Sequence, residues 1–440
     1  MKKPAVRERH PRRPLRLGVE RSSDLSILFN AGSLTGTMAI NAALGFVYWW
    51  LAARFFAPAA VGLASAAISA MLLLGNAGML GLGTLLLGIL PKSQGHEGEL
   101  ISLGLGSAAL AGGVLGVGLA LVSPWVAEDL GVLAGGIGHV ALFGLGVSLT
   151  SAALVLDQAL IGLSRGTVQL RRNVTFALGK LILLLLLGIW LGDGSGLIIY
   201  ATWVAGIVLS FAVITRATPM SLEIRFTRVW TLIRDLGRAA IAHHVLNLVL
   251  QAPGLMLPLI VTAILSAEVN AGFYVAWMFV GLVFVPSESL ATVLFTASAA
   301  SPEHLQQRLK RLGLLSFGIV TMANMALWFL GGPILALFGE TYAATAIPSL
   351  HILALGAFPL IIRSYYVAVR RIEERVKVTA FLMTGGAMLE LVAAALGALW
   401  GGLLGLCLGW VAALCLQALV LAPRLLRTMR RGPQPAHPSS

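Results

Sequence analysis

Five ionisable side chains lie inside long apolar segments of this sequence, where a charge is costly. They are Asp157, Lys180, Glu288, Arg363 and Glu390. A charged side chain at the centre of a bilayer costs roughly 2.5 to 3.5 kcal/mol even on a lenient insertion scale, so contact with lipid is disfavoured and a functional role is the default hypothesis. Such groups attract ions, carry protons or hold a polar substrate. We therefore predict that all five line or support a polar path through the membrane.

Two stripes of polar residues accompany these charges, one in each half of the chain. In each stripe a polar residue recurs at every fourth position, which places the three side chains on one face of a helix. Such residues also hold neighbouring helices together, which is the alternative interpretation. Because the stripes fall at equivalent places in the two halves, we favour a shared, water-accessible cavity. The stripes are Ser33, Thr37 and Asn41, and His243, Asn247 and Gln251.

Asp157 and Arg363 are the most informative pair, because they fall at equivalent positions with opposite charge when the second half of the chain is laid over the first. We expect them to meet between the two halves and to latch the basic side of the protein shut. A static bridge from Asp157 to Lys180 within one half is the alternative. Lys180 and Arg363 also lie close enough to a basic loop to extend toward the membrane surface.

The two glutamates have different settings. Glu288 follows Pro286, and a proline within a span frees backbone groups that must face protein or water. Glu390 stands alone in an otherwise apolar segment, so we consider it a protonatable coupling site. For both residues the alternative is a neutral, hydrogen-bonded carboxylic acid, because burial disfavours the charged form.

The composition fixes the class of the elements that position these residues. Of 440 residues, 58% are hydrophobic and 11% are charged, whereas a soluble domain carries about 25% charged residues. We predict an all-α polytopic membrane protein with about twelve spans of about 20 residues each. The predicted spans are 26–53, 61–90, 101–123, 139–163, 174–191, 196–215, 239–265, 272–298, 312–338, 345–369, 378–399 and 401–422.

The basic residues indicate how these spans are oriented. Most of the 31 Lys and Arg residues fall in the two tails, the central linker and alternate loops, while the opposite loops are acidic. This bias predicts that both termini lie in the cytoplasm. The predicted organisation has two six-helix lobes of similar build, one on each side of a basic linker. Its parts are a basic tail (1–25), an N-lobe (26–215), the linker (216–238), a C-lobe (239–422) and a second tail (423–440).

Motifs for nucleotide binding or metal binding are absent from the sequence. It contains no Walker loop and no H-x-x-x-H zinc pair, and its G-x-S-x-G match at residues 162–166 follows an apolar span and not a strand, so it is not a nucleophile elbow. Cys407 and Cys415 are separated by roughly 12 Å of helix rise, so they do not form a disulfide with each other. We expect no catalytic residues, no cofactor, no metal site and no nucleic-acid partner. An H⁺ or Na⁺ gradient, the membrane potential or consumption of a substrate then remain as energy sources.

Two segments resemble a known family. Residues 46–62, FVYWWLAARFFAPAAVG, end one span in a Leu-Ala-Ala-Arg stretch and open the next through Pro58 and Gly62; residues 76–83, NAGMLGLG, form a glycine-rich stretch. Both are similar to the polysaccharide (O-antigen-type) flippases of the multidrug/oligosaccharidyl-lipid/polysaccharide (MOP) exporter superfamily. The layout of twelve spans, two lobes and a basic linker is similar across nearly the whole chain, although Phe56 and Ala57 replace the more usual Leu-Gly.

This resemblance implies a MATE-like pair of lobes around a central cavity in the bacterial cytoplasmic membrane. The implied activity is movement of a lipid-linked oligosaccharide or polysaccharide precursor across the bilayer by alternating access, with Lys180 and Arg363 attracting the phosphate. The implied partners are the lipid bilayer, the lipid-linked glycan substrate, a glycan polymerase and glycosyltransferases. The alternatives are an ion-coupled exporter of small amphipathic compounds and an integral-membrane enzyme of envelope polysaccharide synthesis. The loop 91–99 lacks the pattern of major-facilitator transporters.

Overall fold

The computed structural model describes residues 43–93, 95–191, 194–212, 237–300 and 302–431, and all regular structure in these ranges is helical. Three predicted polar residues, Ser33, Thr37 and Asn41, lie outside the described ranges, as does most of the predicted linker.

The first half of the chain contains a helix at residues 43–55 followed by six labelled α-helices. The helices are α2 (Pro58–Gly78), α3 (Leu82–Ile89), α4 (Glu97–Val126), α5 (Ile137–Gly162), α6 (Gly166–Leu191) and α7 (Gly196–Ala212), with short 3₁₀ turns η1 (Leu90–Lys92) and η2 (Asp129–Ala134). The predicted span 61–90 is broken between α2 and α3, where Leu80 and Gly81 adopt positive φ angles of 52° and 77°.

The second half contains α9 (Gly237–Ile264), α10 (Ala267–Ala300), α11 (Leu305–Ala336), α12 (Glu340–Leu355), α13 (Ala357–Ile372) and α14 (Val376–Arg431), with the turn η3 (Pro302–His304). The predicted span 345–369 is bent by 40° between α12 and α13. The long α14 comprises two predicted spans, because Gly401 and Gly402 leave the helical conformation. A Cβ on Gly397 would overlap the backbone of Gly405, so the two parts of α14 pack backbone against backbone.

Each predicted span therefore contains a helix within the described ranges. In the described ranges, 8 helices are long and apolar enough to cross a membrane, or up to 9 when the bent pair counts as one span. The shorter α7, the partly described helix 43–55 and the second part of α14 account for the other predicted spans. The predicted fold class, a polytopic all-α membrane protein, is confirmed.

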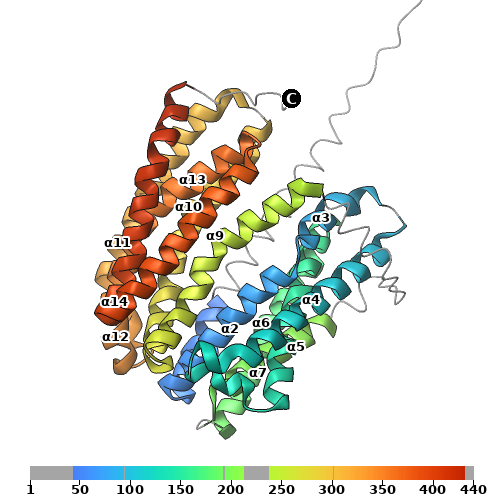
Figure 1. Cartoon of the computed structure of the whole chain (residues 1–440), viewed down its shortest axis with the longest axis vertical. Helices are drawn as coiled ribbons and strands as arrows, with labels where there is room; N and C mark the ends of the chain where they lie inside the picture. Colours follow the sequence, from blue (N-terminus) through green and yellow to red (C-terminus); the bar gives the residue numbers. More distant parts are fainter. Residues whose placement is uncertain (1–42, 94, 192–193, 213–236, 301, 432–440) are drawn as a thin grey trace, which may run out of the picture.

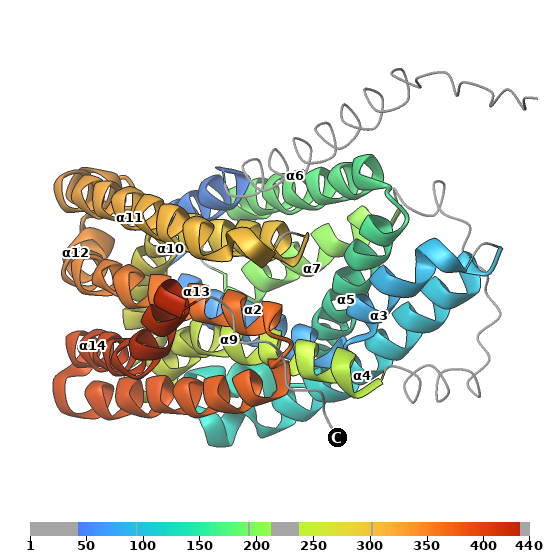
Figure 2. The ribbon, with the colours of Figure 1, turned by 90° about the horizontal axis from the view of Figure 1, so that it is seen from above.

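The helices form two groups, which we call the N-lobe (residues 43–212) and the C-lobe (residues 237–431). Figure 1 shows α2 to α7, in blue to green, beside α10 to α14, in yellow to red, with α9 along the boundary. The view from above in Figure 2 shows the same two groups, with α2 and α9 lying next to each other between them. The two lobes therefore meet along few helices.

Contacts between the lobes concentrate at one end, which we call the interlobe seal. Asn270 of α10 is fully buried, and its Nδ2 donates hydrogen bonds to the carbonyl oxygen of Gly62 at 2.8 Å and to Oγ of Ser65 at 2.9 Å. The backbone N–H of Ala267 donates to Oδ2 of Asp129 at 2.6 Å. A Cβ on Gly62 would overlap the carbonyl oxygen of Ala267, so only glycine permits this approach.

Side chains from the helix at residues 43–55 complete the interlobe seal. Nε1 of Trp50 and Nη2 of Arg54 both donate to the carbonyl oxygen of Leu337, at 2.9 Å and 2.8 Å. The rings of Trp49 and Tyr274 pack with their centroids 4.7 Å apart. The interlobe seal thus lies at the end of the helices where the acidic loops were predicted, opposite the basic loops. It combines hydrogen bonds with aromatic packing.

Candidate functional site

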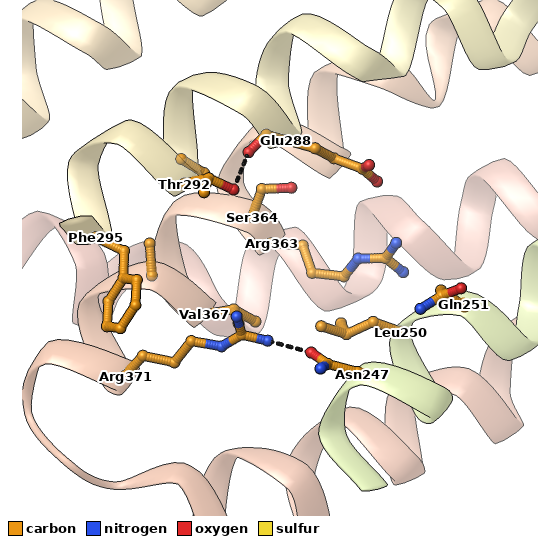
Figure 3. A pocket seen from close by; sticks show the side chains of 12 residues that line it. Asn247, Leu250, Gln251, Glu288, Thr292, Phe295, Arg363, Ser364, Val367 and Arg371 are labelled. Carbon is orange, nitrogen blue, oxygen red and sulfur yellow. Dashed lines mark hydrogen bonds between the residues drawn. The ribbon is translucent and has the colours of Figure 1, made fainter. Parts of the chain in front are cut away.

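A polar cavity lies within the C-lobe. It has a volume of about 230 Å³ and is lined by α9, α10 and α13. Four predicted residues line it together: Asn247, Gln251, Glu288 and Arg363. Figure 3 shows that these side chains project from three different helices toward a common space. Residues far apart in the sequence are therefore brought into one polar pocket.

Arg363 is held in this cavity by Glu390, which reaches it from α14. Nη1 of Arg363 donates to Oε1 of Glu390 at 2.9 Å. Trp410 Nε1 donates to Oε2 of the same carboxylate at 3.0 Å, and Gln417 Nε2 donates to Oε1 at 2.8 Å. Glu390 is 1% exposed and meets three donors, which suits a carboxylate because a carboxylate only accepts hydrogen bonds. Glu390 therefore holds the guanidinium of Arg363 in place without lining the cavity itself.

A second guanidinium, that of Arg371, lines the same cavity. Its Nη2 donates to Oδ1 of Asn247 at 2.6 Å, a contact drawn in Figure 3. Its Nε is buried and has no hydrogen-bond partner among the described residues. A buried polar group without a partner is costly. Arg371 thus brings into the site a positive charge that is held by a neutral amide and retains an unused donor.

The cavity can bind a ligand that carries both an anionic group and hydroxyl groups. Guanidinium groups bind phosphate and carboxylate oxygens with paired N–H donors, and Arg363 and Arg371 both line the wall. Glu288, on α10, adds a carboxylate that accepts hydrogen bonds from hydroxyl groups. Asn247 and Gln251 supply amide donors and acceptors. Phosphorylated sugars have this combination of groups.

The predicted pairing of Asp157 is wrong. Asp157 of α5 bonds to Arg172 of α6, with Nε of Arg172 donating to Oδ1 at 3.1 Å and Nη2 donating to Oδ2. The turn between α5 and α6 is tight, so residues equally far from it on the two helices face each other. Asp157 therefore pairs within the N-lobe, neither with Arg363 across the lobes nor with Lys180.

Lys180 lies in the interior of the N-lobe, in a cage of three aromatic rings. Its Nζ is 3.3 Å from the ring centroid of Trp203, 4.7 Å from that of Phe176 and 4.8 Å from that of Tyr48. Lys180 is only 4% exposed, so it does not extend to the membrane surface. Gly206 on α7 permits this packing, because a Cβ there would lie 2.9 Å from Cβ of Lys180. No described residue pairs a carboxylate with this ammonium.

The cage should contribute measurably to stability. A desolvated cation over an aromatic ring gains about 2 kcal/mol. We expect Trp203→Leu to lower the free energy of unfolding by about 2 kcal/mol more when Lys180 is present than in a Lys180→Met background. Denaturant unfolding in detergent micelles measures all four proteins of this cycle.

Trp190 provides the matched control, because it is 83% exposed on the same lobe. Trp190→Leu should leave stability nearly unchanged. If the effects of the Trp203 and Lys180 substitutions on the free energy of unfolding are strictly additive, the ring does not stabilise the ammonium.

The predicted site residues thus separate into three sets. Asn247, Gln251, Glu288 and Arg363 line the C-lobe cavity, with Glu390 behind them. Asp157 and Lys180 lie within the N-lobe. Asn41 falls outside the described residues.

The sequence indicated neither Arg371 as a cavity residue nor Arg172 as the partner of Asp157, because both fall in segments expected to be basic loops. In the structure α13 extends to Ile372 and α6 begins at Gly166, so both arginines lie inside helices. Arg172 is only 4% exposed. No local sequence pattern separates these two arginines from the loop arginines beside them.

Comparison with solved structures identifies proteins of the same fold. A structure described as an inward-facing conformation of a multidrug resistance MATE family transporter of the MOP superfamily superposes with a TM-score of 0.66 at 14% identity, covering 91% of this chain and 98% of the other. The lipid II flippase MurJ, in an inward closed conformation, gives a TM-score of 0.68 at 14% identity, covering 89% of this chain and 87% of that one.

A MOP superfamily transporter from Pyrococcus furiosus Vc1 (DSM3638), whose description reports reverse polarity of its binding pocket, gives a TM-score of 0.62 at 14% identity. The match covers 92% of this chain and 95% of the other. No protein-family model and no curated protein matches the sequence. At such identity these likenesses show the fold, which is that of the MATE transporters and the flippase, as predicted.

Proposed function

We propose that this chain is a membrane transporter that moves a lipid-linked oligosaccharide or polysaccharide precursor across the bacterial cytoplasmic membrane by alternating access. Its fold is shared with structures described as transporters and a flippase. The substrate proposed here has a charged phosphate-bearing part and a hydroxyl-rich part. For a substrate of this kind, glycosyltransferases would supply the lipid-linked glycan, and a glycan polymerase is a further proposed partner.

The observation that carries this proposal is the C-lobe cavity. Arg371 lines the wall and is held by the neutral Asn247, Arg363 is oriented by Glu390, and Glu288 faces the same space. In this proposal the two arginines hold the phosphate, while Glu288, Asn247 and the hydroxyl-bearing side chains of the wall contact sugar hydroxyls. A purely apolar cargo would leave these groups unpaired at substantial cost.

The position of the interlobe seal supports a direction for this movement. The seal joins the ends of the helices that carry the acidic loops, while the basic loops lie at the other end. If basic loops face the cytoplasm, both termini are cytoplasmic and the conformation is closed toward the outside. We propose that an H⁺ or Na⁺ gradient resets the cycle. Glu288 replaces Glu390 as the candidate coupling carboxylate, because Glu288 faces the cavity with no ion pair among the described residues, whereas Glu390 is paired with Arg363.

Replacing Arg371 by glutamine should abolish most transport and leave the fold intact. Hydrogen bonds from a charged group contribute about 1.5–3 kcal/mol, so we expect the affinity for a phosphate-bearing substrate to fall by at least about tenfold. Purified protein in liposomes with a fluorescent polyprenyl-diphosphate oligosaccharide measures this movement.

Arg311→Gln is the matched control, because Arg311 is exposed at the start of α11 and lies outside the cavity. This variant should transport as the unmodified protein does. Movement of the labelled lipid no faster than in empty vesicles, for a folded unmodified protein, would overturn the proposed substrate.

A second candidate is an ion-coupled exporter of small amphipathic compounds. Its specific support is the size of the cavity, since about 230 Å³ accommodates a small molecule more readily than a whole glycan. The same liposomes loaded with an amphipathic dye distinguish the two. Dye movement driven by an imposed H⁺ or Na⁺ gradient, without movement of the glycolipid, would favour the exporter.

A further inference from the structure

A second cavity of about 720 Å³ lies in the C-lobe, and α13 contributes to the walls of both cavities, with Arg370 lining this one and Arg371 the one described above. Its wall is formed by the end of α13, the start of α14 and the end of α14. It therefore lies at the end of the C-lobe opposite the interlobe seal, beside the turn between α13 and α14. None of its lining residues belongs to the candidate transport site.

The lining of this cavity is strongly basic. Four arginines surround it: Arg370, Arg375, Arg424 and Arg427. The single carboxylate in its wall is that of Glu373, which accepts a hydrogen bond from Nη1 of Arg370 at 2.7 Å. Three of the four guanidinium groups therefore have no ion pair with a carboxylate in the described part of the chain. Like charges held this close repel each other unless an anion lies among them.

The arginines are also incompletely satisfied as hydrogen-bond donors. Nε of Arg370 is buried and has no partner within the described ranges. Nη1 of Arg424 reaches only the hydroxyl of Tyr366, at 3.5 Å, which is at the limit of a hydrogen bond. The cavity thus presents charged donors and, apart from Glu373, few acceptors. A ligand that fits must be rich in negatively charged oxygen atoms.

The surroundings of the cavity indicate that this ligand is a lipid. Val378 lines the cavity and is 58% exposed, and Phe381, about one turn further along α14, is 85% exposed. Large apolar side chains with this exposure on a membrane-spanning helix face acyl chains. The acyl chains of a bound lipid would therefore lie along an apolar helix surface next to its headgroup, whereas a free anion would contact only the arginines.

We propose that this cavity binds the headgroup of an anionic membrane lipid that carries two phosphates, with its acyl chains along Val378 and Phe381. Two phosphates balance the unpaired arginines better than one, and basic pockets between helices at the membrane surface recognise such headgroups. The site is a resident lipid site, distinct from the proposed transport cavity. Its effect is to hold the ends of α13 and α14 together.

Lipid binding to the detergent-purified full chain tests this proposal. Native mass spectrometry and thermal unfolding are carried out with cardiolipin, phosphatidylglycerol, phosphatidylcholine and inorganic pyrophosphate as separate probes. Cardiolipin should bind most tightly and raise the melting temperature. The variant Arg424→Gln/Arg427→Gln should bind cardiolipin about 30-fold more weakly, equal to about 2 kcal/mol, since each basic residue near a membrane surface contributes about fivefold.

The matched control is Lys310→Gln/Arg311→Gln, which removes two exposed charges at the same end of the C-lobe but outside the cavity. This control should bind cardiolipin as the unmodified protein does. Equal loss of binding in both double variants would show only general charge attraction and overturn the proposal. Stabilisation by pyrophosphate equal to that by cardiolipin would overturn the assignment to a lipid.

Discussion

Replacing Gly62 by alanine is expected to open the interlobe seal. The added Cβ would overlap the carbonyl oxygen of Ala267, and a backbone atom cannot move aside as a side chain does. Overpacking at such a contact costs about 1–3 kcal/mol, which shifts the equilibrium toward separated lobes by between about fivefold and about 100-fold. Transport by the proposed alternating access should fall, because that cycle needs both closed states.

Thiol labelling measures this opening. Ser65→Cys places a fully buried thiol in the seal, in a background where Cys407 and Cys415 are alanine. A membrane-impermeant maleimide should label it slowly when Gly62 is intact and much faster in the Gly62→Ala variant. Gly118→Ala is the control, because a Cβ there meets open space. Equal labelling in the Gly62 and Gly118 variants would contradict the predicted role of Gly62.

Removing Glu390 is expected to have the largest effect on stability. Glu390→Leu leaves the guanidinium of Arg363 without its anion and the N–H groups of Trp410 and Gln417 without their acceptor. Removing one partner of a buried ion pair costs about 3–5 kcal/mol. Thermal unfolding in detergent should show a marked decrease in melting temperature.

The double variant Arg363→Met/Glu390→Leu separates stability from transport. Replacing both partners of a buried pair with apolar residues is often neutral or stabilising, so this protein should recover much of the lost stability. It should still fail to transport, because Arg363 lines the cavity. A Glu390→Leu protein that melts at the temperature of the unmodified protein would show that the pair contributes little.

Apolar runs and charge bias were enough to predict the helices. Within the described ranges each predicted span contains helix, because backbone groups in lipid must be satisfied within their own segment, although 61–90 and 345–369 each divide into two helices. The cost of a charge in lipid selected Glu288 and Arg363, and the polar stripe selected Asn247 and Gln251; the structure places all four around one cavity. These predictions needed only local sequence and the properties of the bilayer.

Pairings between helices could not be predicted in the same way. Glu390 meets Arg363 because α13 and α14 pack together, and no local pattern specifies that contact. The pair Arg370-Arg371 is typical of a basic loop, yet Arg371 lies on the cavity side of a helix that continues past it. Arg172 was misassigned for the same reason. At the membrane surface a basic residue fits the charge bias whether it lies in a loop or in the last turn of a helix, so sequence alone does not distinguish the two positions.

The interlobe seal lies at one end of long helices, so a small tilt at the seal moves the other end of such a helix by a larger distance. The 34 residues of α10 span about 51 Å at 1.5 Å per residue. A tilt of about 5° around the buried Asn270 would therefore displace the far end of α10 by roughly 4 Å, comparable to the radius of a helix with its side chains. A small angular change near these hydrogen bonds would therefore change the separation of the two lobes at the opposite end.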